Sequence, residues 1–187
     1  MSSSAWPSPI LLPYRGVGPR VDPSAFLAPG VVVVGDVVIG PQTSVWFGSV
    51  LRADMGTIRV GARSNLQEGT VVHVTSGGQG VFIGDDVTIG HQALVHECRL
   101  EDRAFVGMRA AVLDGAVIES GGVLAAGALL TPNKRLPSGQ VWTGIPARYW
   151  RDVTPDDWAT FTSPAAEYVE LVRHYGGKLN ESLRAVP

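Results

Sequence analysis

The sequence lacks several features that would place a chain in a common functional class. Its 187 residues include a single cysteine, Cys98, so no disulfide can form within the chain, which suits a reducing cytoplasm. The formal net charge is −2, so no basic excess points to nucleic acid or an anionic membrane. No run of about eighteen apolar residues occurs, and the opening MSSSAWPSPILLPY lacks a basic start and a long apolar core. We therefore expect a cytoplasmic protein without a transmembrane helix or a signal peptide.

What the sequence does contain is an aliphatic residue at every sixth position over much of its length. This period fits neither a sheet face nor a helix stripe, and a short repeat in many copies is typical of a stacked solenoid. A small or β-branched residue usually follows four positions later, as Thr43, Ser49 and Ala93 do. We predict an all-β solenoid with three hexapeptides in each triangular coil and these aliphatic side chains inside it: Leu27, Val33, Ile39, Val45, Leu51, Val60, Leu66, Val72, Ile83, Ile89, Val95, Val106, Val112, Ile118, Leu124 and Leu130.

The pattern also predicts how the chain is divided. Residues 1–18 are expected to form an N-terminal lead-in, residues 19–150 the β-helix domain, and residues 151–187 a C-terminal helical segment with a tail. Breaks in the six-residue spacing predict loops that leave the coil. One such break, the nine-residue step from Leu51 to Val60, predicts a small loop.

The C-terminal segment carries two helix start signals. Thr154 stands before Pro155 and two acidic residues, a combination that caps a helix and complements its dipole. A second start is expected at Ser163, before Pro164, and Gly176 is expected to end that helix. An apolar stripe on this helix needs a partner, which the solenoid or a neighbouring chain could supply.

Three of the four histidines fall in one stretch of the repeat. With three strands to a coil, counting places Arg52, His73 and His96 on the same face, each one residue after its aliphatic. We therefore predict that the two histidines stack one coil apart, with backbones about 4.8 Å from each other. His91 follows its aliphatic by two residues on a different face, so it cannot easily meet the other two within one chain.

A second chain could bring His91 to His73 and His96. Three subunits in a closed ring would then form three equivalent clusters, and three histidines with an open position are the ligand set of a catalytic zinc site. A single histidine in a repeat is more often an ordinary surface residue. The stacked pair together with a third histidine on the facing surface favours the metal site.

Two other residues near this stretch have competing interpretations. Trp46 lies on the face that should meet the neighbouring chain, where it is either an interface anchor or a partly buried surface aromatic. Cys98, two residues after His96, could act as a soft metal ligand, but a buried inert thiol is the favoured interpretation.

Residues 45–74, VWFGSVLRADMGTIRVGARSNLQEGTVVHV, and residues 83–98, IGDDVTIGHQALVHEC, are the most informative segments. With them the sequence resembles the gamma-class carbonic anhydrase family over nearly all of residues 10–175. The resemblance implies a left-handed β-helix, a homotrimer with a metal ion at each subunit interface, and reversible hydration of carbon dioxide to bicarbonate. All-nitrogen ligation suits zinc and also iron(II) or cobalt.

The resemblance also implies roles for individual residues. His73 and His96 match the metal ligands from one chain, and His91 matches the ligand from its neighbour. Arg52 and Asp54 match a pair that ties subunits together near the site.

Further matches surround the metal position. Gln67 matches a side chain that orients the metal-bound water or the substrate, and Asn65 belongs to the same motif. Glu68 matches a nearby acidic residue that is usually aspartate, and Tyr168 resembles a tyrosine of the C-terminal helix that reaches the pocket.

The sequence departs from the family pattern where protons should leave the site. Met55 stands where the prototype enzymes carry a glutamate, and the loop Thr75–Gly80, TSGGQG, contains no carboxylate. Two alternatives therefore stay open. One is a hexapeptide-repeat acyltransferase with one essential histidine and a pantetheine groove beside the later coils, and the other is a catalytically silent metal-binding scaffold with a structural or regulatory role.

Overall fold

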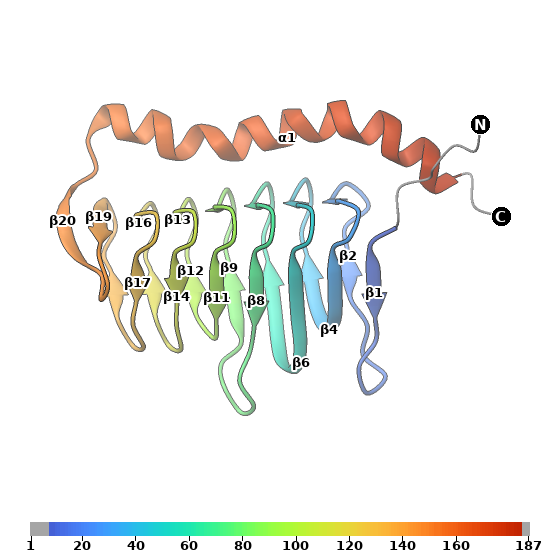
Figure 1. The fold of residues 1–187 in the computed structure, drawn as a ribbon, viewed down its shortest axis with the longest axis horizontal. Helices are drawn as coiled ribbons and strands as arrows, with labels where there is room; N and C mark the ends of the chain where they lie inside the picture. Colours follow the sequence, from blue (N-terminus) through green and yellow to red (C-terminus); the bar gives the residue numbers. More distant parts are fainter. Residues whose placement is uncertain (1–7, 185–187) are drawn as a thin grey trace.

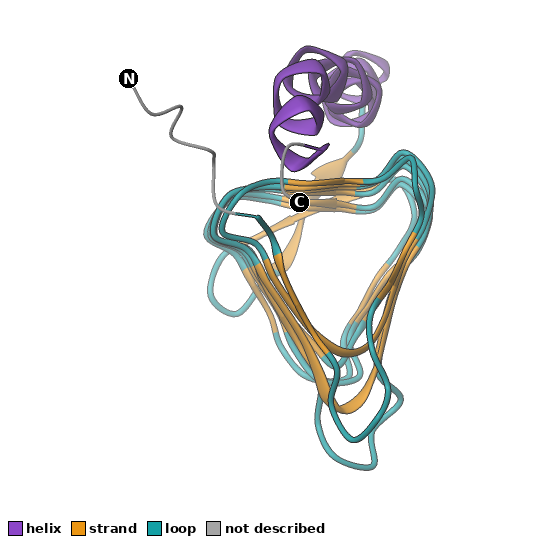
Figure 2. Ribbon diagram, turned by 90° about the vertical axis from the view of Figure 1, so that its right-hand side faces the viewer, coloured by secondary structure: helices purple, strands orange, loops and turns teal. Residues whose placement is uncertain are grey.

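The computed structural model describes residues 8–184, with side chains through residue 175. The ends of the predicted lead-in and tail, residues 1–7 and 185–187, lie outside the described residues. The chain forms a left-handed parallel β-helix of triangular cross-section, and one long helix lies along one of its three faces (Figures 1 and 2). The fold class expected from the six-residue period is confirmed.

Each face of the triangle is a column of short strands stacked coil upon coil. The helix-covered face contains β3 (Phe26–Leu27), β5 (Ser44–Val45), β7 (Asn65–Leu66), β10 (Thr88–Ile89), β13 (Phe105–Val106), β16 (Val123–Leu124), β19 (Gln140–Thr143) and β20 (Arg148–Asp152). All neighbours on this face pair in parallel except β19 and β20, which are antiparallel.

Two long strands, β4 (Val32–Ile39) and β6 (Val50–Val60), join the other two faces. Their first halves belong to the histidine face, with β1 (Ile10–Leu12), β8 (Val71–His73), β11 (Leu94–His96), β14 (Ala111–Val112) and β17 (Leu129–Leu130). Their second halves belong to the third face, with β2 (Arg20–Val21), β9 (Val81–Ile83), β12 (Arg99–Leu100), β15 (Val117–Ile118) and β18 (Arg135–Leu136).

The repeating aliphatic residues fill the interior. Leu51, Val72, Val95 and Val112 lie directly above one another, and each is fully buried. The counted registers of the first two faces are thus confirmed. On the third face the count missed Leu100, which joins the interior column one coil after β9, because the step that precedes it is five residues rather than six.

The extra residues between Leu51 and Val60 do bulge at the corner, as expected, but not as an irregular loop. Instead β6 is continuous through this region and pairs with β4 on one side and with β8 and β9 on the other. Residues 54–57 of β6 stand opposite the single residue Asp36 of β4, so this extra stretch extends beyond the paired ladder at the corner.

The C-terminal segment is one helix, α1 (Pro155–Arg184), rather than two. The predicted cap is confirmed, since Thr154 Oγ1 accepts a hydrogen bond from Asp157 N at 3.2 Å, and Asp157 Oδ2 accepts one from Thr154 N at 2.8 Å. The second start and the stop at Gly176 are wrong, because α1 passes through Pro164 and continues beyond Gly176. Packing on the solenoid outweighs the roughly 3 kcal/mol cost of an interior proline.

Aromatic side chains fasten α1 to the solenoid. Trp46 is 2% exposed, and its ring centroid lies 5.2 Å from Phe26, 5.1 Å from Tyr168 and 5.3 Å from Tyr175. Trp46 is therefore buried by α1 of its own chain, and is neither an anchor between subunits nor a partly buried surface aromatic.

Replacing Trp46 with alanine should lower the free energy of unfolding by about 3–5 kcal/mol, since it removes a large buried ring. Urea unfolding followed by circular dichroism measures this loss. Trp150, 59% exposed on β20, is the matched control, and W150A should change the value by no more than about 0.5 kcal/mol. Equal losses in both variants would show that Trp46 does not anchor the helix.

No helix within the described part of the chain combines the length and the apolar character needed to cross a membrane.

Candidate metal centre

Arg52, His73 and His96 stack on the histidine face, as counted from the sequence. Arg52 pairs with His73 and His73 with His96 on successive parallel strands. The two imidazole rings lie 5.2 Å apart at their centroids, tilted by 47°, and His73 Nδ1 is 3.2 Å from His96 Nε2. The solenoid thus holds two ring nitrogens face to face.

The other nitrogen of each ring faces a carboxylate. His73 Nε2 lies 3.3 Å from Asp54 Oδ1, and His96 Nδ1 lies 2.9 Å from Asp114 Oδ1. These contacts and the one between the rings each need a hydrogen, three in all, whereas two neutral imidazoles carry only two. If both rings donate to their carboxylates, the facing nitrogens direct two lone pairs toward each other. A cation there would complete the arrangement.

The distance between the facing nitrogens fits a metal ion. Two nitrogens bound to one tetrahedral zinc at about 2.0–2.1 Å would lie roughly 3.3 Å apart. Metal-binding histidines usually donate their second ring N–H to a carboxylate or a carbonyl, which fixes the tautomer. His73 and His96 meet both conditions.

Asp54 is held as an anion next to His73. Burial tends to raise the pKa of this carboxyl, but the hydrogen bond from Arg52 Nη1 and the positive charge of Arg52 outweigh it, so the pKa is lowered. Arg52 and Asp54, predicted as a pair, do pair within the chain. Their arrangement keeps an acceptor on His73 Nε2 at neutral pH.

Asp114 was not predicted from the sequence. It comes one coil after His96 and accepts hydrogen bonds from His96 Nδ1 and, at 3.3 Å, from Thr75 Oγ1. The available signal was an acidic residue two positions after the aliphatic Val112, in the coil that follows the stacked histidines.

Glu97 anchors the predicted loop Thr75–Gly80 beside the histidines. Glu97 is a buried residue, 6% exposed. Its carboxylate accepts hydrogen bonds from Thr75 N at 2.8 Å and from Gly80 N at 2.5 Å. A carboxylate therefore does lie next to this loop, but its oxygens already accept hydrogen bonds from the loop backbone.

His91 lies on a different face, at the corner that follows β10. Its Nδ1 is 2.6 Å from Glu68 Oε2, but the ring is not oriented for a hydrogen bond, and this oxygen is buried without a hydrogen-bond partner among the described residues. As at His73 and His96, a carboxylate covers one ring nitrogen and leaves the other available.

Within residues 8–184, no group of three or more histidine, cysteine or acidic side chains is arranged to hold a metal ion. The structure therefore brings His73 and His96 together but not His91. Cys98 is 4% exposed, and burial raises the pKa of its thiol well above the ordinary range, as expected of an inert buried thiol.

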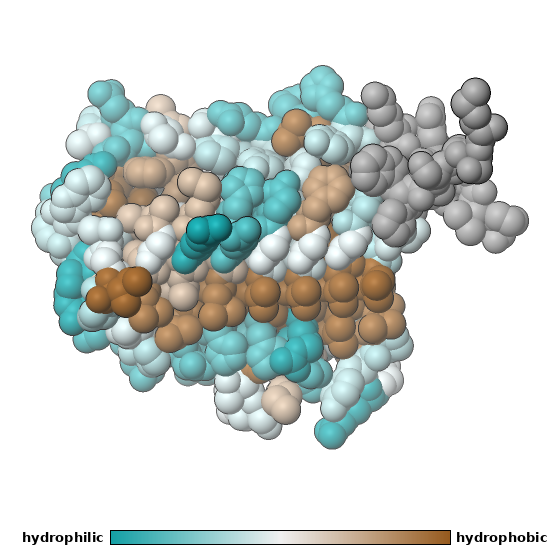
Figure 3. Space-filling view, viewed as in Figure 1, coloured by the Kyte–Doolittle hydropathy of each residue, from teal (hydrophilic) through white to brown (hydrophobic). Residues whose placement is uncertain are grey.

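The histidine face carries a continuous row of outward-pointing apolar residues, which Figure 3 shows as a brown band along the molecule. Three of its side chains are markedly exposed: Ile10 at 47%, Val71 at 40% and Leu94 at 37%. Strand pairing places these members of the apolar row side by side: Ile10, Val32, Val50, Val71, Leu94, Ala111 and Leu129. Exposed apolar bands of this kind mark interaction surfaces.

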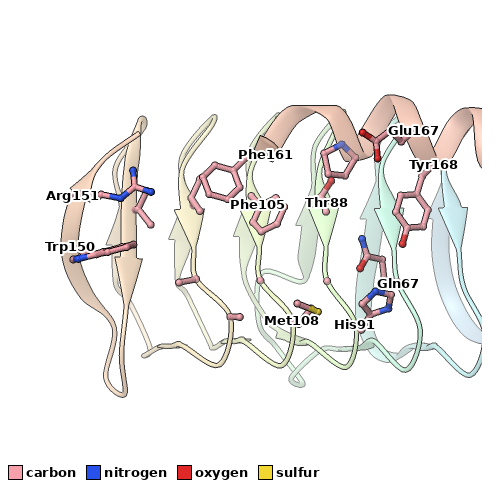
Figure 4. A pocket seen from close by; sticks show the side chains of 17 residues that line it. Gln67, Thr88, His91, Phe105, Met108, Trp150, Arg151, Phe161, Glu167 and Tyr168 are labelled. Carbon is pink, nitrogen blue, oxygen red and sulfur yellow. The ribbon is translucent and has the colours of Figure 1, made fainter. Parts of the chain in front are cut away.

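A groove of about 470 Å³ lies between α1 and the later coils of the helix-covered face. Gln67, His91 and Tyr168 line one end, and aromatic residues such as Phe105 and Phe161 line its length (Figure 4). Gln67 is a buried residue, 8% exposed, and its Nε2 donates a hydrogen bond to Asn65 Oδ1 at 3.1 Å. The structure thus gathers Gln67, Tyr168 and His91 in one place.

Tyr168 is held in its neutral form. Burial, with the negative charges of Glu68 and Glu167, raises the pKa of its phenol from 10.0 to about 12. The stability that depends on the neutral phenol is present below pH 10.0 and is lost as the pH rises toward 12.

Absorbance at 295 nm should accordingly show one tyrosine of the folded protein ionising near pH 12, and Y168F should lack that step. Urea unfolding of Y168F should depend less on pH above 10 than that of the unaltered protein. An unchanged late titration step in Y168F would contradict the assignment.

The chain is similar to named proteins over most of its length. No family model matches the chain. The mitochondrial protein "Gamma carbonic anhydrase 1" of Arabidopsis thaliana is 43% identical over 173 residues, which cover 90% of this chain and 63% of that protein. A protein of Geobacillus kaustophilus named "Carbonic anhydrase" is 37% identical over 166 residues, covering 89% of this chain and 91% of that one.

A solved structure of a hexapeptide transferase family protein from Anaplasma phagocytophilum has a TM-score of 0.85 and 44% identity, covering 89% of this chain and 98% of that chain. The chain spans less than two thirds of the Arabidopsis protein but most of the Geobacillus protein. Both proteins named above as carbonic anhydrases are more than 30% identical to this chain over 89–90% of its length. The chain therefore belongs to the gamma carbonic anhydrase family.

Proposed function

We propose that the protein is a homotrimeric metalloenzyme that reversibly hydrates carbon dioxide to bicarbonate at sites between subunits. The observation that carries this proposal is the pair of facing nitrogens on His73 and His96, 3.2 Å apart, each with its outer nitrogen against a carboxylate. His91 of a neighbouring subunit would be the third ligand. Zinc fits this ligand set, and iron(II) or cobalt could replace it.

A zinc ion bound by three imidazoles supplies hydroxide at neutral pH, because it lowers the pKa of its water to about 7. The residues of the chain prepare the site for it. Asp54 and Asp114 keep the ligand nitrogens of His73 and His96 free of protons by accepting the hydrogen on the opposite side of each ring. Glu68 places a carboxylate against Nδ1 of His91. Gln67 orients the reacting water, and Tyr168 offers a neutral hydroxyl.

The apolar row on the histidine face supports the assembly. Leu94 and Val71 flank His96 and His73 in the same strands, so a subunit covering the row would also reach the two imidazoles. Removing this band from water would stabilise association, and a contact between unlike faces closes a ring of three.

Metal reconstitution with a hydration assay tests the proposal. The chelator-treated protein, loaded with zinc, iron(II) or cobalt, should bind about one ion per chain, because each of three interfaces holds one site. Stopped-flow measurement should then show hydration above the uncatalysed rate. Absence of bound metal would refute the site. Full metal occupancy without hydration above the uncatalysed rate would favour the catalytically silent scaffold. Met55 and the loop without a carboxylate are the sequence features that support this alternative.

A second candidate function has one observation in its favour. The groove beside the later coils has the position expected for a pantetheine arm, with His91 at one end, and a similar solved structure is titled a hexapeptide transferase family protein. Calorimetric titration with coenzyme A separates the two, since the hydratase predicts no binding there.

A further inference from the structure

A chain of three polar side chains lies buried beneath α1 (Figure 4 labels its two ends). Thr88 and Asn65 are neighbours on adjacent strands, 1% and 0% exposed, and Asn65 Nδ2 donates to Thr88 Oγ1 at 2.9 Å. Gln67 Nε2 in turn donates to Asn65 Oδ1 at 3.1 Å. The polar relay, Thr88–Asn65–Gln67, therefore lies along the wall of the groove and ends beside His91.

Packing alone does not explain these residues. One coil after Thr88 the same outward position holds Phe105, whose ring packs 4.8 Å from Phe161 of α1. An apolar residue can therefore occupy this column under the helix, whereas buried amides are costly unless every group is paired. The polar relay therefore contributes something other than apolar packing against α1.

The neighbouring coils show why Thr88 bonds across strands. One coil before Asn65, Trp46 Nε1 donates to Ser44 Oγ at 3.0 Å within a single strand, the same spacing that joins Gln67 to Asn65. The residue that would bond Thr88 in this way is Gly90, which has no side chain. A Cβ at Gly90 would lie 2.7 Å from Met108 N, so close coil packing excludes one. The Thr88 hydroxyl is left for Asn65.

The relay gives the Gln67 amide a direction. Each amide has a donor end and an acceptor end. In the observed pairing Thr88 Oγ1 accepts from Asn65 Nδ2, and Asn65 Oδ1 faces Gln67. That oxygen attracts Gln67 Nε2 inward, and Gln67 Oε1 is left facing the groove above His91 (Figure 4). A carbonyl oxygen there can accept a hydrogen bond from the reacting water.

We propose that Thr88 is a positioning residue, which acts through Asn65 to present the carbonyl oxygen of Gln67 to the substrate water. The role in hydration rests on the proposed function, whereas the orientation of the amide does not. Thr88 contacts neither substrate nor metal. Its effect is to keep Gln67 an acceptor, which orients the hydrogen of the water and leaves a lone pair of its oxygen free to attack carbon.

Side-chain amide exchange in the metal-free protein tests the orientation directly. In ¹⁵N-labelled protein, the Gln67 Nε2 hydrogens should exchange with solvent at least about tenfold more slowly than those of the exposed Gln42 and Gln79. T88V should remove this protection, because Asn65 loses its acceptor, and T88S should retain it. Loss of the resonance in Q67E gives the assignment.

The matched control is T43V, which removes another fully buried threonine hydroxyl on the same side of the solenoid, bonded to Gly61 O at 2.7 Å. It should lower stability without changing the exchange of the Gln67 amide. In the metal-loaded protein, T88V should lower kcat/KM for hydration by about tenfold while metal content is kept, and T88S should restore it.

The two proposals can fail separately. Unchanged Gln67 exchange in T88V, or rapid Gln67 exchange in the unaltered protein, would overturn the positioning role even if hydration is found. Protection that is lost in T88V and kept in T88S would uphold the orientation in a protein that hydrates nothing. Equal loss of kcat/KM in T88V and T88S would overturn the kinetic role.

Discussion

Chains carrying His91→Ala and chains carrying His96→Ala, each inactive alone, should regain metal and activity when they are assembled together. Each variant alone lacks one of three ligands in every site, and its metal affinity should fall by at least about 100-fold. In a mixed ring, an interface between an H91A chain that supplies His73 and His96 and an H96A chain that supplies His91 is complete. Random mixing at equal amounts should make about a quarter of the interfaces complete.

The measurement is bound zinc and stopped-flow hydration after co-refolding from urea. The matched control is a mixture of H73A and H96A chains. Because both ligands must come from the same chain, this mixture contains no complete interface and should stay at the level of either variant alone. Recovery in the control, or none in the H91A and H96A mixture, would contradict a site shared between subunits.

Leu94→Asp should dissociate the proposed trimer into folded monomers and abolish metal binding. Leu94 is 37% exposed in the centre of the apolar row and stands two residues before His96. In the assembled protein an aspartate there would be an unpaired buried charge, which costs several kcal/mol in each of three interfaces, by a rough estimate. In the monomer the same side chain faces water, so the fold should persist.

Light scattering coupled to size exclusion measures the mass, and far-UV circular dichroism measures the fold. Phe82→Asp is the matched control, because Phe82 is 40% exposed and lies on the third face, which is not part of the proposed subunit interface. F82D should remain a trimer with a full complement of metal. A trimeric L94D protein would show that the apolar row is not the subunit interface.

Much of the fold could be predicted because the six-residue period is a local property of the chain. The interior column of Leu51, Val72 and Val95 follows from counting, and the stacking of His73 on His96 follows from the same count. The period failed where the step length changed, and so Leu100 was missed. The continuous α1 was missed because helix start and stop signals were weighed without the sheet on which it packs.

The sequence by itself determined the coil, the faces and the order of the histidines, since in a solenoid each strand contacts the one that lies a fixed number of residues away. The tertiary structure alone decided which side chains meet across coils and corners. Asp114 reaching His96, Glu97 beneath the Thr75–Gly80 loop and Thr88 behind Asn65 all depend on side-chain direction and on small differences in step length. A hydrogen bond requires its two atoms to be placed within a few tenths of an ångström. Spacing along the sequence does not fix positions that closely, and only the packing of neighbouring coils does.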